Sequence, residues 1–224
     1  MCDSVLPSNL KGFHIHCVGI KGTGVVALVE ILHAHGAVIT GSDVSERFYT
    51  DEILDKLKIK ALPFSSQNIT DSVQLVIYSS AYNPDTNPDL AEAVKRGIPV
   101  LLYTQALGAF SKNAYSCGVC GVHGKTTTTG LCGSIFKELD FPGAVLAGSI
   151  ISSFGGCTYT SPVSAEASPL KKSFFIAETC EYQRHFMSFF PQKIILTSVE
   201  SDHQDYYPTF KDIQRAVVDY ICLL

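Results

Sequence analysis

The chain has 224 residues, enough for one large domain or two smaller ones, and its composition (46% hydrophobic, 17% charged) is typical of a globular protein. Its net charge of −4 argues against a broad basic surface for nucleic acid, so any bound anion must be held by local donors. Glu30, His33 and His35 interrupt the longest apolar stretch before it reaches membrane-spanning length. We expect neither nucleic acid nor a membrane as a partner.

The N-terminus carries no recognisable targeting signal. Residues 1–4 read M-C-D-S, without the basic segment and apolar core of a secretory signal. We therefore expect a cytoplasmic protein.

Strand and helix signals alternate through the first half of the chain. Short apolar runs predict strands at 13–19, 37–41, 73–78 and 98–102. Apolar residues at helical spacing predict helices at 24–36, 49–58 and 88–96. This rhythm predicts an α/β fold that begins with a Rossmann-like parallel sheet covered by helices on both faces.

A glycine-rich turn joins the first predicted strand to the first predicted helix. Residues 19–24 read G-I-K-G-T-G, and Asp43 ends the second strand, where a carboxylate can reach a ribose hydroxyl. A dehydrogenase dinucleotide, another diphosphate-bearing nucleotide and a plain tight turn all fit the glycines, but a plain turn leaves Asp43 unexplained. At the end of the third strand, Ser79 and Ser80 fit a ligand crevice or ordinary turn chemistry equally well. The candidate nucleotide-binding residues here are Gly22, Thr23, Gly24, Asp43, Ser79 and Ser80.

A second series of strand and helix signals follows a junction at residues 105–116, which predicts a short helix and then polar residues. The new series begins with a strand at Tyr115 and continues with a helix at 126–139. We therefore expect two domains, 1–112 and 113–224, the second a partial α/β domain that contains a phosphate-binding loop.

Cys117 and Cys120, two of the eight cysteines, form a CxxC pair of the kind found in redox centres and zinc sites. No second CxxC and no HxxxH in the sequence completes a set of four metal ligands. The pair lies in the strand predicted at Tyr115, and a strand directs side chains i and i+3 to opposite faces. We expect buried apolar thiols in a reducing cytosol.

The most informative stretch, residues 120–129, reads C-G-V-H-G-K-T-T-T-T between a strand and a helix. Its glycines let the backbone bend around a phosphate with N–H groups pointing inward, and the helix adds the positive end of its dipole. Lys125 supplies a mobile cation, and the Thr126 hydroxyl can ligate Mg²⁺. The standard motif has a glycine where this chain has Val119, so the loop is a shortened GxxGKT form. The residues predicted to bind a nucleoside triphosphate are Gly121, Val122, His123, Gly124, Lys125, Thr126 and Thr127.

Acidic and histidine side chains follow the next two predicted strands, 174–177 and 194–197. Because ligands of open α/β sheets bind beyond the carboxyl ends of the strands, we expect Glu178 and His203 in the same crevice as Lys125. A carboxylate and an imidazole suit a second metal ion, although single Glu and His residues are more often surface groups. The predicted metal ligands are Thr126, Glu178 and His203, and the predicted catalytic residues are Lys125, Glu178 and His203.

The remaining segments are less distinctive. Residues 157–169 are rich in Ser, Thr and Pro and predict a loop or hairpin. Phe210, Ile213, Val217 and Tyr220 have helical spacing. No capping signal follows this helix before Leu224, and we expect that the chain stops inside a domain.

The ordered set of motifs resembles the Mur ligase family over nearly the whole chain. The motifs are GxxGxG at 19–24, GSD at 41–43, SSA at 79–81, GVHGKTTTT at 121–129, the glutamates Glu178 and Glu181, and DH at 202–203. Within the family, the resemblance is to the members that join L-alanine to UDP-N-acetylmuramate in building the peptide stem of peptidoglycan.

The resemblance implies an ATP-dependent, ADP-forming reaction in which the sugar's lactyl carboxylate becomes an acyl phosphate that an amine attacks. It implies ATP and Mg²⁺ as cofactors, and UDP-N-acetylmuramate and L-alanine as substrates. Gly121, Gly124, Lys125 and Thr126 would hold the ATP phosphates, with Thr126 on the first Mg²⁺ and Thr127 supporting the loop. Glu178 and His203 would hold a second metal between the γ-phosphate and the substrate carboxylate, where cations screen two mutually repelling anions. Gly22, Gly24, Asp43 and the turn at Ser79 and Ser80 would bind the uridine diphosphate end.

Two features depart from the family pattern. The alanine-adding members read E-A-D-E-S where residues 178–182 read E-T-C-E-Y. At this position, Tyr182 resembles instead the relative that attaches a recycled tripeptide. The family is also longer and carries a C-terminal domain that binds the amino acid and closes over ATP. We therefore expect this chain to bind the UDP-sugar but to be a poor ligase.

Rival functions account for less of the sequence. A dehydrogenase leaves the GKT loop unexplained, and a simple phosphate-loop kinase has no use for the first half of the chain. A ligase for the tripeptide and a nucleotide-binding module without catalysis stay open as alternatives.

Overall fold

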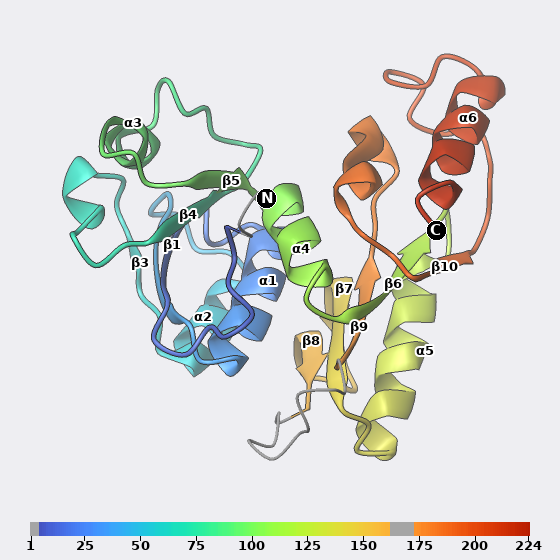
Figure 1. The fold of residues 1–224 in the computed structure, drawn as a ribbon, viewed down its shortest axis with the longest axis horizontal. Helices are drawn as coiled ribbons and strands as arrows, with labels where there is room; N and C mark the ends of the chain where they lie inside the picture. The colour runs from blue at the N-terminus through green and yellow to red at the C-terminus, as the bar shows by residue number, and fades with distance from the viewer. Residues whose placement is uncertain (1–4, 162–172) are drawn as a thin grey trace. The chain divides into compact units, whose positions relative to one another are not determined.

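Two five-stranded sheets organise the residues that the computed structural model describes, 5–161 and 173–224. Each sheet belongs to its own unit, Met1–Ala106 and Leu107–Leu224 (Figure 1). The division falls inside α4 (Tyr103–Ser111), a few residues before the predicted boundary at 112/113. The reason is that the two ends of α4 pack differently: the Tyr103 ring fills the space beside Gly24, whereas Gly108 lies against the backbone of Ser188.

The first unit is a parallel sheet in the order β3-β2-β1-β4-β5. Its strands are β1 (His14–Val18), β2 (Val38–Ser42), β3 (Ala61–Leu62), β4 (Leu75–Tyr78) and β5 (Val100–Leu102). Its helices are α1 (Thr23–Ala34), α2 (Asp51–Leu57), α3 (Pro88–Lys95) and the 3₁₀ helix η1 (Ser66–Asn68). This strand order is that of a Rossmann-like sheet and confirms the predicted fold class.

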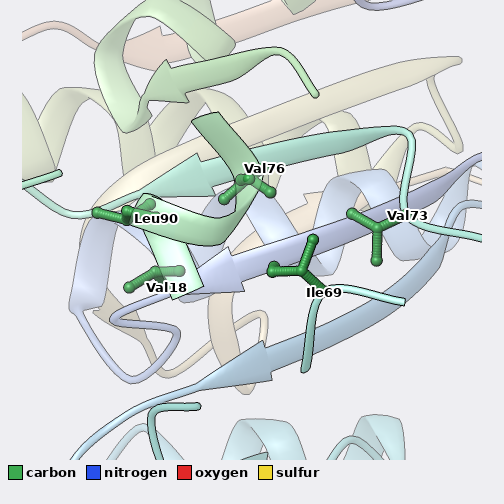
Figure 2. Close-up of a cluster of buried hydrophobic side chains, with 6 residues drawn as sticks. Val18, Ile69, Val73, Val76 and Leu90 are labelled. Atoms are coloured by element: carbon green, nitrogen blue, oxygen red, sulfur yellow. The ribbon is translucent and has the colours of Figure 1, made fainter. Parts of the chain in front are cut away.

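Alternating strand residues divide the core of the first unit between the two faces of its sheet. Val18 and Val76 pack with Leu90 of α3 and with Ile69 and Val73 (Figure 2). Helices α1 and α2 lie on the other side of the sheet from α3 (Figure 1). Since a parallel sheet is buried on both faces, its strands read as nearly continuous apolar runs, which is why periodicity located them.

The second unit has the strand order β10-β6-β9-β7-β8, parallel except for the antiparallel pair β7 and β8. Its strands are β6 (Tyr115–Cys120), β7 (Gly143–Ile151), β8 (Gly156–Thr160), β9 (Phe174–Glu178) and β10 (Lys193–Leu196). Its helices are α5 (Lys125–Glu138), the 3₁₀ helix η2 (Tyr182–Ser188) and α6 (Phe210–Ile221). Strand β7 has no counterpart in the sequence prediction. Of the loop or hairpin predicted at 157–169, residues 157–160 belong to β8 in a hairpin with β7, and residues 162–169 lie outside the described residues.

Helices α5 and α6 cover opposite faces of the second sheet. Val119 of β6 packs with Phe136 of α5, whereas a Cβ atom on the adjacent Gly118 would collide with the Tyr220 hydroxyl of α6. The CxxC pair follows the same alternation, and burial raises the pKa of the thiol to about 11 at Cys117 and about 12 at Cys120. Both thiols are therefore protonated at neutral pH, which does not fit a pair of reactive redox thiols.

Within residues 5–161 and 173–224, no helix combines the length and the apolar character that crossing a membrane requires.

Candidate functional site

The glycine-lysine-threonine loop joins β6 to α5 and has the backbone geometry of an anion cradle. Gly121 and Gly124 have φ values of +127° and +82°, in the region that favours glycine. A side chain on Gly121 would also collide with Thr197, which follows β10. The Thr197 hydroxyl donates to the carbonyl oxygen of His123 at 2.5 Å, and the Ser198 hydroxyl accepts from the His123 N–H at 2.9 Å. The neighbouring strand end thus holds the loop in its bent form.

Three strand ends meet at this loop because of the sheet register. Val119 of β6 lies opposite Glu178 of β9, and Cys120 of β6 lies opposite Leu196 of β10. The segments that follow these strands therefore leave the same edge of the sheet, where ligands of open α/β sheets bind. This arrangement brings together four of the predicted residues, Lys125, Thr126, Glu178 and His203. Glu181, which was not among the predicted site residues, lies with them.

The Lys125 ammonium lies over the loop and is largely buried, with its side chain 13% exposed. Its Nζ donates to the carbonyl oxygens of Gly121 at 2.6 Å and Val122 at 3.2 Å. The same Nζ lies 2.9 and 3.1 Å from the two carboxylate oxygens of Glu181. A cation is thus held at the N-terminus of α5, where the helix dipole already favours an anion.

Thr126 and Glu178 form an oxygen-rich pair next to the lysine. The Thr126 hydroxyl donates to Glu178 Oε2 at 2.8 Å, and the backbone N–H of Gly148 in β7 donates to the same oxygen at 2.8 Å. Hydroxyl and carboxylate oxygens are hard ligands, and Mg²⁺ is usually bound through one or two carboxylates together with phosphate oxygens. The donor set of Thr126 and Glu178 therefore fits one Mg²⁺ ion.

His203 lies near Glu181, a residue of the predicted motif that had no predicted role. His203 has a left-handed φ of +52°, held by Asp202, whose carboxylate accepts the His203 N–H at 2.7 Å. The His203 Nε2 atom lies 3.1 Å from Glu181 Oε1. Among the described residues, no group of three or more His, Cys, Asp or Glu side chains is arranged to hold a metal ion. The metal pair Glu178 and His203 thus stays a prediction.

Glu181 is the residue that sequence reasoning missed. The Glu181 side chain is 1% exposed, and the Tyr207 hydroxyl donates to the backbone carbonyl oxygen of Glu181 at 2.5 Å. A charged residue in a loop after a strand is normally expected at the surface, so nothing in the local pattern indicated burial. Only its place beside Glu178 in the family motif marked it.

The other predicted loop residues are more peripheral. His123 and Thr127 are exposed, and the His123 ring lies 3.9 Å from the Glu200 carboxylate. Val122 is buried, and its backbone N–H donates to the carbonyl oxygen of Ser198.

The glycine-rich turn of the first unit opens onto a pocket of about 250 Å³. Four predicted residues line this pocket, Gly22, Thr23, Asp43 and Ser79. Three aromatic residues that were not predicted also line it, Phe48, Tyr49 and Tyr82. Gly24 instead makes room for the Tyr103 ring, and Ser80 is an exposed residue outside the pocket lining.

The Asp43 carboxylate accepts hydrogen bonds from neighbouring groups in the pocket wall. It is 6% exposed, and its oxygens accept the N–H groups of Lys21 at 2.7 Å and Val44 at 2.8 Å. The Tyr82 hydroxyl donates to it at 2.8 Å, and burial together with this carboxylate raises the pKa of Tyr82 to about 12. In this structure Asp43 therefore fixes the shape of the glycine-rich turn.

Comparison with known proteins gives a consistent result for the whole chain. The model of the Mur ligase family catalytic domain matches residues 14–115, which cover the first sheet and end where β6 begins. A curated UDP-N-acetylmuramate–L-alanine ligase from Treponema pallidum is 50% identical over 223 residues, covering 99% of this chain and 44% of the relative. The chain thus spans less than half the length of that relative.

Solved structures show the same fold. The UDP-N-acetylmuramate–alanine ligase of Thermotoga maritima matches with a TM-score of 0.73 at 26% identity, covering 92% of this chain and 46% of that chain. The Neisseria meningitides ligase named for UDP-N-acetylmuramate and L-alanyl-γ-D-glutamyl-meso-diaminopimelate matches with a TM-score of 0.77 at 22% identity, covering 95% and 68%. At that lower identity the match supports the fold alone.

Proposed function

This chain belongs to the Mur ligase family, and on that premise we propose that it is the nucleotide-binding part of an ADP-forming amide ligase. The whole protein would join L-alanine to UDP-N-acetylmuramate through an acyl phosphate, in the cytoplasmic synthesis of peptidoglycan precursors. The observation that carries this proposal is the meeting of Lys125, Thr126 and Glu178 at the N-terminus of α5. A cation, a hydroxyl and a carboxylate beside a glycine-bent loop are what phosphoryl transfer requires of a protein.

In this proposal each residue of the second unit has a positioning or electrostatic task. The loop N–H groups and Lys125 bind the terminal phosphates of ATP, while Thr126 and Glu178 supply oxygen ligands for Mg²⁺. His203 is proposed as a further metal ligand through Nδ1, the ring nitrogen that does not face Glu181. Bound Mg²⁺ would neutralise phosphate charge, so that an anionic carboxylate can approach the γ-phosphate.

The pocket of the first unit is proposed to bind the uridine diphosphate end of the sugar nucleotide. Gly22 and Thr23 present the N-terminus of α1 to the diphosphate, and Ser79 offers a hydroxyl on the facing strand end. Asp43 contributes by holding the turn in shape.

The amine substrate is proposed to be L-alanine because the 50% identical relative is named for that amino acid. One observation favours the tripeptide as an alternative. Tyr182, which follows Glu181, places its ring 4.8 Å from the His203 ring and donates its hydroxyl to Asp205 at 2.7 Å. A tyrosine at this position, in place of the serine of the alanine-adding members, resembles the relative that attaches a tripeptide.

The proposal is tested first by ligand-induced thermal stabilisation of the 224-residue chain. UDP-N-acetylmuramate and MgATP are each expected to raise its unfolding temperature, since a ligand that binds only the native state stabilises it. NAD, the ligand of the dehydrogenase alternative, is expected to leave it unchanged. Stabilisation by NAD alone would overturn the proposal.

The reaction itself is tested by phosphate release. A form extended to the length of the relatives is given ATP, UDP-N-acetylmuramate and either L-alanine or the tripeptide. Release that depends on L-alanine supports the main proposal, and release that depends on the tripeptide supports the alternative. If neither amine causes phosphate release and no ligation product forms, both proposals are contradicted.

A further inference from the structure

The buried carboxylate of Glu181 is the least expected group in the second unit. An ionised carboxylate that is 1% exposed must be paired, and its partners are the Lys125 ammonium at 2.9 Å and the His203 Nε2 at 3.1 Å. The carboxylate therefore connects the phosphate loop to the turn that carries His203.

The lysine in this arrangement has no donor left for a phosphate. An ammonium group has three N–H donors, and Lys125 Nζ contacts the carbonyls of Gly121 and Val122 and the carboxylate of Glu181. The two carbonyls belong to the loop itself and are neutral, whereas Glu181 follows β9 and is the charged partner of the lysine. A phosphate oxygen that reaches Lys125 thus competes with Glu181.

The negative charge of Glu181, like its contact with Lys125, opposes the binding of a phosphate at the loop. This charge lies next to a loop that is proposed to accept a triphosphate, and because it is buried, solvent and salt screen it weakly. His203 Nε2 already lies 3.1 Å from Oε1, so the carboxylate has a second partner besides the lysine.

We propose that Glu181 is a positioning residue that holds Lys125 back in the nucleotide-free protein and passes to His203 when a triphosphate takes the lysine. This inference rests on the proposed function, because it assumes that the loop binds a triphosphate. Its consequence is that Glu181 lowers the affinity of the loop for phosphate and couples occupancy of the loop to the position of His203.

The test is calorimetric titration of the 224-residue chain with inorganic triphosphate, which reports on the phosphate loop without an adenine pocket. The variant Glu181→Gln keeps the shape of the side chain and removes its charge. We expect it to bind triphosphate about tenfold more tightly than the wild type, the change that corresponds to one charge-assisted hydrogen bond. The matched control is Asp205→Asn, which removes an exposed charge in the same unit that pairs with Tyr182 instead of Lys125, and we expect its affinity to stay within about twofold of the wild type.

Weaker or equal binding by Glu181→Gln would overturn the inference, as would an equal gain in Asp205→Asn. If the wild type itself binds no triphosphate, both the proposed function and this inference fail. If the wild type binds triphosphate but Glu181→Gln binds it no more tightly, only this inference fails.

A second measurement uses the wild type alone and does not depend on how the variant folds. Nuclear magnetic resonance follows the His203 ring signals, assigned with a His203→Gln sample, as triphosphate is added. The inference predicts that these signals shift in step with binding. Unchanged His203 signals at saturation would contradict the transfer of Glu181 to His203.

Discussion

Gly148 shows how one residue without a side chain can set the geometry of a neighbouring carboxylate. Its N–H donates to Glu178 Oε2, and a Cβ atom added to it would lie 2.8 Å from that oxygen and 3.0 Å from the other. Real Cβ atoms do not approach so closely, so the carboxylate would have to move. Glycine at this position allows β7 to lie against the proposed magnesium ligand.

The substitution Gly148→Ala tests this role. We expect the added methyl group to push Glu178 away from Thr126 and to reduce the gain in ATP affinity that Mg²⁺ provides by about tenfold, a typical effect of losing a group that orients a metal ligand. Calorimetric titrations with and without Mg²⁺ measure that gain. Ser149→Ala, at the next, exposed residue of β7, is the control, and an equal Mg²⁺ effect in both variants would contradict the role.

The motifs of the sequence predicted which residues form the site, but not which of these residues contact one another. The GKT loop indicated Lys125 and Thr126 because glycine spacing and residue chemistry are local properties. That Lys125 and His203 both contact Glu181 depends on how the segments after β9 and β10 fold back, and no local pattern encodes such long-range contacts.

At the scale of elements, a buried polar network ties α3 to the first sheet. Asp89 of α3 is fully buried, and its carboxylate lies 3.1 Å from the ring of His16 in β1. It also accepts the Asn68 side-chain amide at 2.8 Å and the Ser65 N–H at 2.9 Å. Burial alone would raise the pKa of this carboxyl group, but the hydrogen bonds from His16 and Asn68 outweigh it, and the pKa lies below its ordinary value of 3.8.

This shift predicts acid sensitivity of the first unit. Because the pKa of Asp89 is lower in the folded state, its contribution to stability is complete above about pH 5 and is lost as the pH falls through 3.8 toward the folded-state value. We expect the free energy of unfolding to fall more between about pH 5 and about pH 3 in the wild type than in Asp89→Asn. Urea denaturation at the two pH values measures the difference. Parallel losses in the two proteins would show that Asp89 does not set the acid response.

Elements with strong periodicity were predicted well, and β7 was missed for a physical reason. Its sequence, G-A-V-L-A-G-S-I-I at 143–151, has glycines in the middle and at one end, which weaken a strand signal. Those glycines are explained by close neighbours: Gly148 lies against Glu178, and Gly143 lies against the backbone of Phe174. Close packing of this kind is visible only in the folded chain.

At the scale of the whole molecule, the chain consists of two units, each with a glycine-rich turn between a strand and the helix that follows it. The first unit places such a turn before α1, and the second places one before α5. The proposed function assigns the uridine diphosphate to the first turn and the triphosphate to the second. The two ligands are therefore expected to bind at separate sites and to have separable mutational effects.

The most direct test of this account is a calorimetric titration of the chain with MgATP, comparing the wild type with Lys125→Met. The account predicts saturable binding by the wild type, a loss of affinity of about a hundredfold in the variant because a charged contact to phosphate is removed, and unchanged binding of UDP-N-acetylmuramate by both proteins. Circular dichroism spectra of both proteins check that the variant folds. Equal MgATP affinity in the two proteins would contradict the central claim that the Lys125 loop grips the triphosphate.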